Sequence, residues 1–128
     1  MRELVGGGFL VLHGFVHLWY VVLSQGWVEA EEQMGWNGHS WLLSSHLPTE
    51  TILSIASVLY IVAALGFAAG GMGYVLDQDW AVTVLVATAV LSTVVLVVMW
   101  DEKPDLLVEK GILGVLINLG IVYLLVLW

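Results

Sequence analysis

Residues 4–28 read LVGGGFLVLHGFVHLWYVVLSQGWV, an apolar run that contains no Asp, Glu, Lys or Arg. A helix of about 20 such residues crosses the hydrocarbon core of a bilayer, which is about 30 Å thick. Three further runs, at residues 51–76, 81–100 and 111–128, also lack all four charged residue types. The mean hydropathy of the chain is +0.97. This pattern predicts an all-α integral membrane protein built as a four-transmembrane-helix bundle.

The four runs and their connections fill nearly all of the 128 residues, so we expect a single domain over residues 1–128. The sequence Gly70-Gly71-Met72-Gly73 is expected to end the second helix, because glycine is a poor helix former. The helices are therefore expected at about residues 4–24, 50–70, 80–100 and 106–128.

The connection at residues 25–49 is too long for a bare turn between two helices. A connection of this length in a small domain is commonly a lid or a binding segment. It contains Trp27, Trp36 and Trp41, and tryptophan rings favour the headgroup level of a membrane. We therefore expect an interfacial loop that lies over one end of the bundle.

The composition excludes several classes of function. The chain has no cysteine, which removes disulfides, thiolate catalysis, Cys-ligated zinc and ordinary iron–sulfur clusters. Three basic residues stand against eleven acidic ones, giving a net charge of −8. Nucleic acid is therefore not an expected partner, since few groups could neutralise its phosphates. So acidic a chain also suits a salt-loving organism.

An even number of spans places both termini on the same side of the membrane, opposite residues 25–49 and 101–110. Basic residues set the orientation of membrane proteins, and here Arg2 and the amino terminus on one side balance Lys103 and Lys110 on the other. We expect a multi-pass protein of a prokaryotic cytoplasmic membrane with both termini in the cytoplasm.

Two histidines lie within the first apolar run. His13 and His17 are one helical turn apart, about 6 Å along the axis, so they share a face that Tyr20 continues. Lipid cannot satisfy an imidazole nitrogen, so this face must turn toward the bundle interior. Asn118 lies at a comparable depth in the last run and could meet His13. We therefore predict a ligand-binding polar pocket of His13, His17, Tyr20 and Asn118 beneath a lid that contains Trp41.

Several chemistries are compatible with this pocket. Imidazoles at positions i and i+4 form a usual metal-binding pair, and His39 or His46 in the loop could add further ligands. A quinone or haem is also possible, although the second, third and fourth runs contain no histidine for a bis-histidine haem. Alternatively, His13 and His17 only join helices by hydrogen bonds. A proton relay would need partners, and the helix interiors contain no carboxylate.

Small residues in the runs favour close helix packing. Gly66-x-x-x-Gly70 is a surface of this kind. We favour packing within one chain, while a homo-oligomer or a partner in a membrane complex remains open. The hydroxyls within the runs are expected to bond to carbonyls of their own helix and to carry no function. They belong to Ser54, Ser57, Thr88 and Ser92.

The run Leu12-His13-Gly14-Phe15-Val16-His17-Leu18 resembles the H-G-x-x-H opening of a loosely defined prokaryotic group of small, uncharacterised four-helix membrane proteins. Ser40-Trp41-Leu42-Leu43, Trp100-Asp101 and the spacing from Gly114 to Asn118 also fit that group. The segment between Asp101 and Gly114 is longer than the pattern of the group. The resemblance implies the four-helix fold and no particular activity. The architecture is also similar to that of DoxX-type membrane proteins.

The sequence thus favours a membrane protein that binds a small molecule, a metal or a redox cofactor in an intramembrane polar pocket. The alternative is a non-catalytic structural or accessory subunit of a membrane complex. An enzyme is not expected, because the chain has no H-E-x-x-H motif and no evident pairing of a nucleophile with a base.

Overall fold

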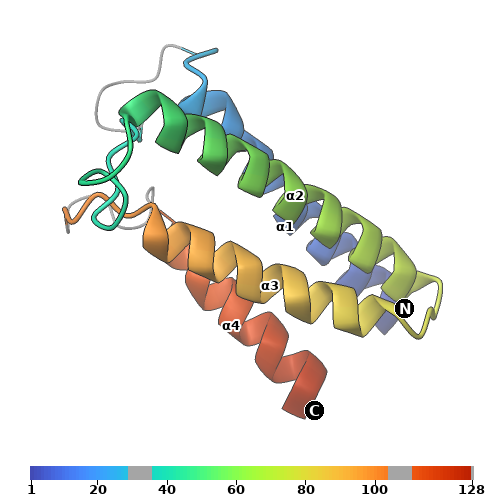
Figure 1. Ribbon diagram of the computed structural model, residues 1–128. Coiled ribbons are helices and arrows are strands. Elements are labelled where there is room, and N and C mark those ends of the chain that lie inside the picture. Colours follow the sequence, from blue (N-terminus) through green and yellow to red (C-terminus); the bar gives the residue numbers. More distant parts are fainter. Residues whose placement is uncertain (29–35, 104–110, 128) are drawn as a thin grey trace.

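The computed structural model describes residues 1–28, 36–103 and 111–127, which form helices and contain no strand. The helices in chain order are α1 (Arg2–Ser24), α2 (Thr49–Val75), α3 (Ala81–Val98) and α4 (Ile112–Leu127). Each helix packs on the next one along the chain, and both termini lie at the same end of the bundle as the α2–α3 turn (Figure 1). The predicted all-α, four-helix fold is confirmed.

Three of these helices, α1, α2 and α3, are long and apolar enough to cross a membrane, and α4 is a shorter apolar helix. The outward faces of all four helices carry large apolar side chains that are at least half exposed. Examples are Phe15, Val58, Val94 and Leu124. A surface so rich in exposed apolar residues is suited to lipid rather than to water. The chain is therefore a membrane protein.

The second helix is longer than expected. It continues through Gly70, Gly71 and Gly73 to Val75, so the predicted end near Gly70 is wrong. These glycines serve close packing: a Cβ added at Gly70 would lie 2.8 Å from Leu85 side-chain atoms, and one at Gly73 would lie 2.6 Å from the Trp80 ring. Neighbouring helices can support glycine within a membrane helix.

The other helix boundaries are near those expected. The third helix differs by one or two residues at each end. The described part of the fourth begins at Ile112, directly after Gly111, which has a φ of +102°. Residues 106–110 of the predicted fourth helix lie outside the described residues.

Glycines bring α1 and α2 into close contact. A Cβ added at Gly7 would lie 2.7 Å from the carbonyl oxygen of Gly71 and would also clash with Val75. One added at Gly14 would lie 2.9 Å from the Phe67 Cβ. Backbones can approach this closely only where a side chain is missing. The α1–α2 contact therefore depends on Gly7 and Gly14.

The predicted Gly66-x-x-x-Gly70 surface of α2 faces α3 of the same chain. A Cβ added at Gly66 would collide with Thr88, while Gly70 contacts Leu85. The motif is thus used for packing within the chain, as expected.

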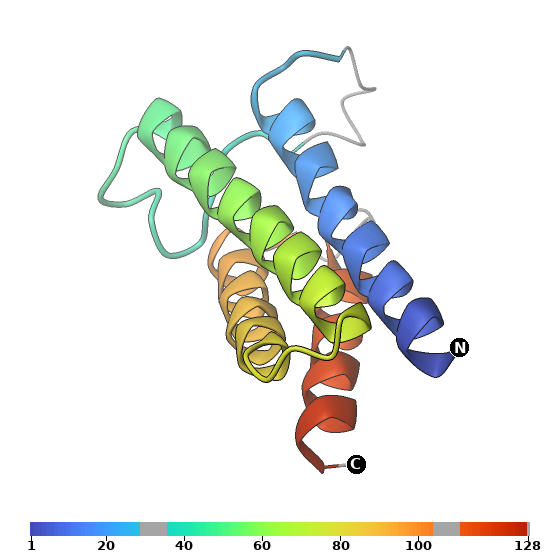
Figure 2. The ribbon, with the colours of Figure 1, turned by 90° about the vertical axis from the view of Figure 1, so that its right-hand side faces the viewer.

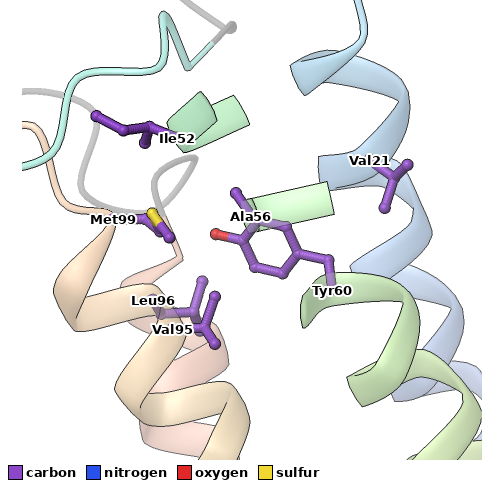
Figure 3. Close-up of a cluster of buried hydrophobic side chains, with 7 residues drawn as sticks. All are labelled: Val21, Ile52, Ala56, Tyr60, Val95, Leu96 and Met99. Carbon is purple, nitrogen blue, oxygen red and sulfur yellow. The ribbon is translucent and has the colours of Figure 1, made fainter. Parts of the chain in front are cut away.

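Two clusters of buried apolar side chains occupy the two halves of the bundle. One lies toward the end that carries residues 36–48 (Figure 3) and consists of Val21, Ile52, Ala56, Tyr60, Val95, Leu96 and Met99. The other lies toward the termini and consists of Leu10, Phe67, Leu85, Ala89 and Ile121. Four buried polar residues fall between the two clusters along their helices, near the middle of the bundle: His13, His17, Ser92 and Asn118.

The segment at residues 36–48 is fixed to the end of α3 by hydrogen bonds. The Ser40 hydroxyl donates to the Val98 carbonyl at 2.5 Å, and the Trp41 indole donates to the Val97 carbonyl at 2.8 Å. The Trp41 backbone N–H donates to the Trp100 carbonyl at 2.9 Å. These donors satisfy carbonyls that have no partner within the helix at its C-terminus.

Candidate intramembrane binding site

Four buried polar side chains from α1, α3 and α4 form a polar network. His13 Nε2 lies 2.9 Å from Asn118 Oδ1, and Asn118 Nδ2 donates to Ser92 Oγ at 2.8 Å. Ser92 Oγ lies 2.6 Å from His17 Nε2, and His17 Nδ1 lies 3.1 Å from the His13 carbonyl oxygen. The hydrogen bonds therefore close a ring that begins and ends at His13.

The bonding partners determine where the protons lie. The His13 carbonyl and Asn118 Oδ1 can only accept, so His17 carries a proton on Nδ1 and His13 carries one on Nε2. Ser92 accepts a proton from the Asn118 amide, which leaves its own hydroxyl proton to be donated to His17 Nε2. Every hydrogen bond in the ring is thus satisfied with both imidazoles neutral, as suits an apolar environment.

The polar network lies in the interior of the bundle. His17 and Asn118 are 1% and 0% exposed, and His13 and Ser92 are also buried. Both imidazoles therefore face inward, and His13 meets Asn118 as expected from their similar depth. This contact joins α1 to α4, whose backbones do not approach closely elsewhere in the described residues.

Ser92 was assigned no function from the sequence. Ser54 and Ser57 do bond to carbonyls one turn earlier in their own helix, both at 2.9 Å. Ser92 instead bonds to side chains of two other helices. Nothing in the local sequence distinguishes these serines, because the difference depends on which residues face Ser92 across the bundle.

Aromatic rings surround the polar network. The His13 ring packs edge-on against Phe67, with ring centroids 4.8 Å apart. Tyr20 stacks on Tyr60 at 5.2 Å and lies edge-on to His17 at 6.4 Å. The structure thus places Tyr20 beside the network, as expected, through ring contacts.

The loop residues assigned to the site lie elsewhere. Trp41 is 46% exposed and is bonded to the end of α3, so it does not cover the polar network. His39 Nε2 lies 3.9 Å from Glu102 Oε2 at the surface, and His46 is exposed. In residues 1–28, 36–103 and 111–127, no group of three or more His, Asp or Glu could hold a metal. The predicted metal set of His13, His17, His39 and His46 is not brought together.

A groove, here called the α1–α4 groove, runs between these two helices toward the termini. Its volume is about 450 Å³. The helix α4 diverges from α3 toward its C-terminus (Figures 1 and 2), which widens the space beside α1. The groove is lined by Arg2, Gly6, Phe9, Leu10, Tyr74, Ile121, Leu124 and Leu125.

Two residues that line the α1–α4 groove are near neighbours of the polar network. Leu10 precedes His13 by almost one helical turn, and Ile121 follows Asn118 by the same interval, so each pair lies on one face. Phe9, another lining residue, stacks parallel to the His13 ring at 6.2 Å. The described lining of the groove is therefore apolar apart from Arg2 and Tyr74, and the buried side chains of Leu10 and Ile121 lie next to the polar network along their helices.

One nitrogen of the polar network has an unused lone pair. His13 Nδ1 makes no hydrogen bond to any described residue. Every fully enclosed side-chain nitrogen or oxygen in the described residues does have a partner. His13 Nδ1 must therefore retain some accessible surface, and it can accept a hydrogen bond from a ligand.

Only part of this site was predictable from the sequence. The α1–α4 groove was not predicted, because its lining is apolar and resembles any lipid-facing surface. The sequence feature that could have indicated the groove is Gly6, which lies on the same helix face as His13 and has no side chain to fill the space there. Comparison of the chain with protein-family models, with curated proteins and with solved structures gave no match, so the functional interpretation depends on the geometry described above.

Proposed function

We propose that the protein binds a small hydrophobic molecule, drawn from the bilayer, in the α1–α4 groove. The observation that carries this proposal is the groove itself, a largely apolar space of about 450 Å³ whose lining residues Leu10 and Ile121 lie almost one helical turn from His13 and Asn118. Binding sites for small molecules commonly enclose about 300–1,000 Å³ and combine an apolar lining with a few polar groups.

The lining residues favour a ligand that dissolves in lipid. Phe9 and Leu124 line the groove and are 50% and 59% exposed, so the groove opens sideways toward acyl chains. A lipid or a quinone with an apolar tail could enter by this route, and a hydroxyl on it could donate to His13 Nδ1. A metal ion held by protein side chains alone is not favoured, because the described residues offer no set of three ligands.

Filling the groove should prevent binding. A Cβ added at Gly6 would lie 3.6 Å from the Tyr74 ring, an ordinary contact distance, so Gly6→Leu should fold while its side chain occupies the groove. We expect this variant to retain about tenfold less hydrophobic ligand, which corresponds to about 1.4 kcal/mol of binding free energy. The measurement is mass spectrometry of lipids and quinones extracted from gently purified protein.

The matched control for this variant is Gly120→Leu. Gly120 is on α4, does not line the groove, and has no neighbouring heavy atom within 4 Å of an added Cβ. Wild-type protein and Gly120→Leu should retain equal, stoichiometric amounts of ligand. Equal retention by Gly6→Leu, or no ligand in any of the three proteins, would contradict the proposal.

A second function is supported by the polar network itself. Its ring of hydrogen bonds is complete without a ligand and joins α1, α3 and α4. This favours a non-catalytic structural or accessory subunit in which the histidines only hold helices together. Under this alternative, purified protein should be stable and carry no stoichiometric ligand.

We also infer that the protein resides in a prokaryotic cytoplasmic membrane with both termini in the cytoplasm. The cysteine-free chain allows a direct test with single cysteines. Ser45→Cys, at the loop end, should react with a membrane-impermeant maleimide in intact cells, whereas Gln78→Cys, in the α2–α3 turn, should react only after lysis. The opposite labelling pattern would mean that both termini lie outside the cytoplasm. Labelling of both positions in intact cells would contradict an arrangement in which residues 45 and 78 lie on opposite sides of the membrane.

A further inference from the structure

The two ends of the α1–α4 groove differ in chemistry. Toward the middle of the bundle it is lined by the apolar side chains of Leu10 and Ile121. At its outer end lies Arg2, the only charged residue among those that line it. Glu3 belongs to the same end of the bundle but does not line the groove. Among the described residues that line the groove, the charge is therefore that of Arg2, which is positive.

The length of the groove is comparable to the thickness of one lipid leaflet. The lining residues on α1 run from Arg2 to Leu10, eight positions apart, which is about 12 Å of helix at about 1.5 Å per residue. One leaflet contributes about half of the roughly 30 Å hydrocarbon core. Arg2 is exposed, and a long basic side chain at a helix end extends toward the headgroups. The groove thus runs from the headgroup level toward the middle of the membrane.

We propose that the occupant of the α1–α4 groove is a membrane phospholipid whose phosphate is bound by the Arg2 guanidinium and whose acyl chain lies along Phe9, Leu10 and Ile121. Guanidinium groups bind phosphate oxygens through two parallel hydrogen bonds. An acyl chain matches the apolar side chains that line the groove between α1 and α4. This inference names the ligand of the proposed function and depends on it.

The test compares lipids that share two oleoyl chains, two of them with a phosphate-containing headgroup and one with a bare hydroxyl. Full-length protein is equilibrated with dioleoyl phosphatidylethanolamine, dioleoyl phosphatidylglycerol or dioleoylglycerol, and bound lipid is measured by native mass spectrometry. Wild-type protein should bind either phospholipid about tenfold more tightly than dioleoylglycerol, as a charge-assisted contact provides. Arg2→Gln should abolish this preference, and Arg2→Lys should retain part of it.

Two further variants separate this inference from the proposed function. Lys103→Gln removes a basic residue at the opposite end of the bundle and should leave the lipid preference unchanged. Gly6→Leu should weaken the binding of all three lipids. If Arg2→Gln keeps the wild-type preference while Gly6→Leu loses lipid, the assignment of the phosphate to Arg2 is wrong and the groove remains a binding site.

Two other outcomes would contradict the phosphate assignment, and one of them would also contradict the proposed function. Equal affinity of wild-type protein for phospholipid and dioleoylglycerol would overturn the phosphate assignment. Full retention of all three lipids by Gly6→Leu would overturn both the assignment and the proposed function. Because Arg2 is exposed and Gly6 has space for a side chain, neither substitution should prevent folding, and a circular dichroism melt in detergent verifies this.

Discussion

Gly7→Leu should lower the free energy of unfolding by about 3 kcal/mol or more, as expected when a bulky group is forced into a packed interface. The added Cβ would lie 2.7 Å from the carbonyl oxygen of Gly71 and would collide with Val75. A backbone carbonyl cannot move aside by changing rotamer, so α1 and α2 would have to separate. The measurement is reversible unfolding in mixed detergent micelles, followed by circular dichroism.

The adjacent glycine provides the control for this variant. A Cβ added at Gly8 meets no heavy atom within 4 Å, and Gly8 is exposed on the outer face of α1. Gly8→Leu should change the unfolding free energy by no more than about 0.5–1 kcal/mol, and a gain is possible because leucine is the better helix former. If the two substitutions cost the same, α1 and α2 do not cross at Gly7.

The fold was largely predictable because its main determinant is local. A run without charged residues, long enough to cross a membrane, is a helix whatever surrounds it, since lipid offers no partner for backbone groups. The end of α2 was not predictable in this way. Gly70 and Gly73 could equally end the helix or allow a neighbouring side chain to pack closely against it. Which of these occurs depends on Leu85 and Trp80, which pack against the two glycines.

The candidate site was predictable only where depth in the membrane decides the contact. His13 and Asn118 were expected to meet because both are polar and lie near the middle of their helices, and they do so at 2.9 Å. The position of Trp41 depends instead on where a long loop docks, and it docks on the last carbonyls of α3. His39 and His46 lie on the same docked segment, so they remain apart from His13.

Asn118→Leu should lower the free energy of unfolding by about 2–3 kcal/mol. Leucine is similar in size to asparagine, so little of this cost comes from packing. It removes the acceptor for His13 Nε2 and the donor to Ser92 Oγ, and buried groups left without partners cost about 1–3 kcal/mol each, less where a membrane protein finds other partners. The same unfolding measurement applies, with Leu119→Ala, on the exposed face of α4, as the control.

A double-mutant cycle tests whether the polar network acts as one unit. Asn118→Leu already deprives Ser92 of a partner. The loss of unfolding free energy caused by Ser92→Ala should therefore be smaller in the Asn118→Leu protein than in the wild type, by about 0.5 kcal/mol or more. If the losses of unfolding free energy from the two substitutions simply add, the ring of hydrogen bonds does not hold α1, α3 and α4 together as one unit.

The network measurements become informative about function when they are combined with lipid retention. If the network is only structural, Asn118→Leu should destabilise a protein that carries no ligand, and Gly6→Leu should be silent in every assay. If the groove is the binding site, Gly6→Leu should lose the ligand at nearly unchanged stability. Asn118→Leu should then lose stability and retain the ligand in proportion to the folded fraction. The two cases therefore differ in the effect of Gly6→Leu on the bound ligand, because Gly6 lines the groove whereas Asn118 belongs to the polar network.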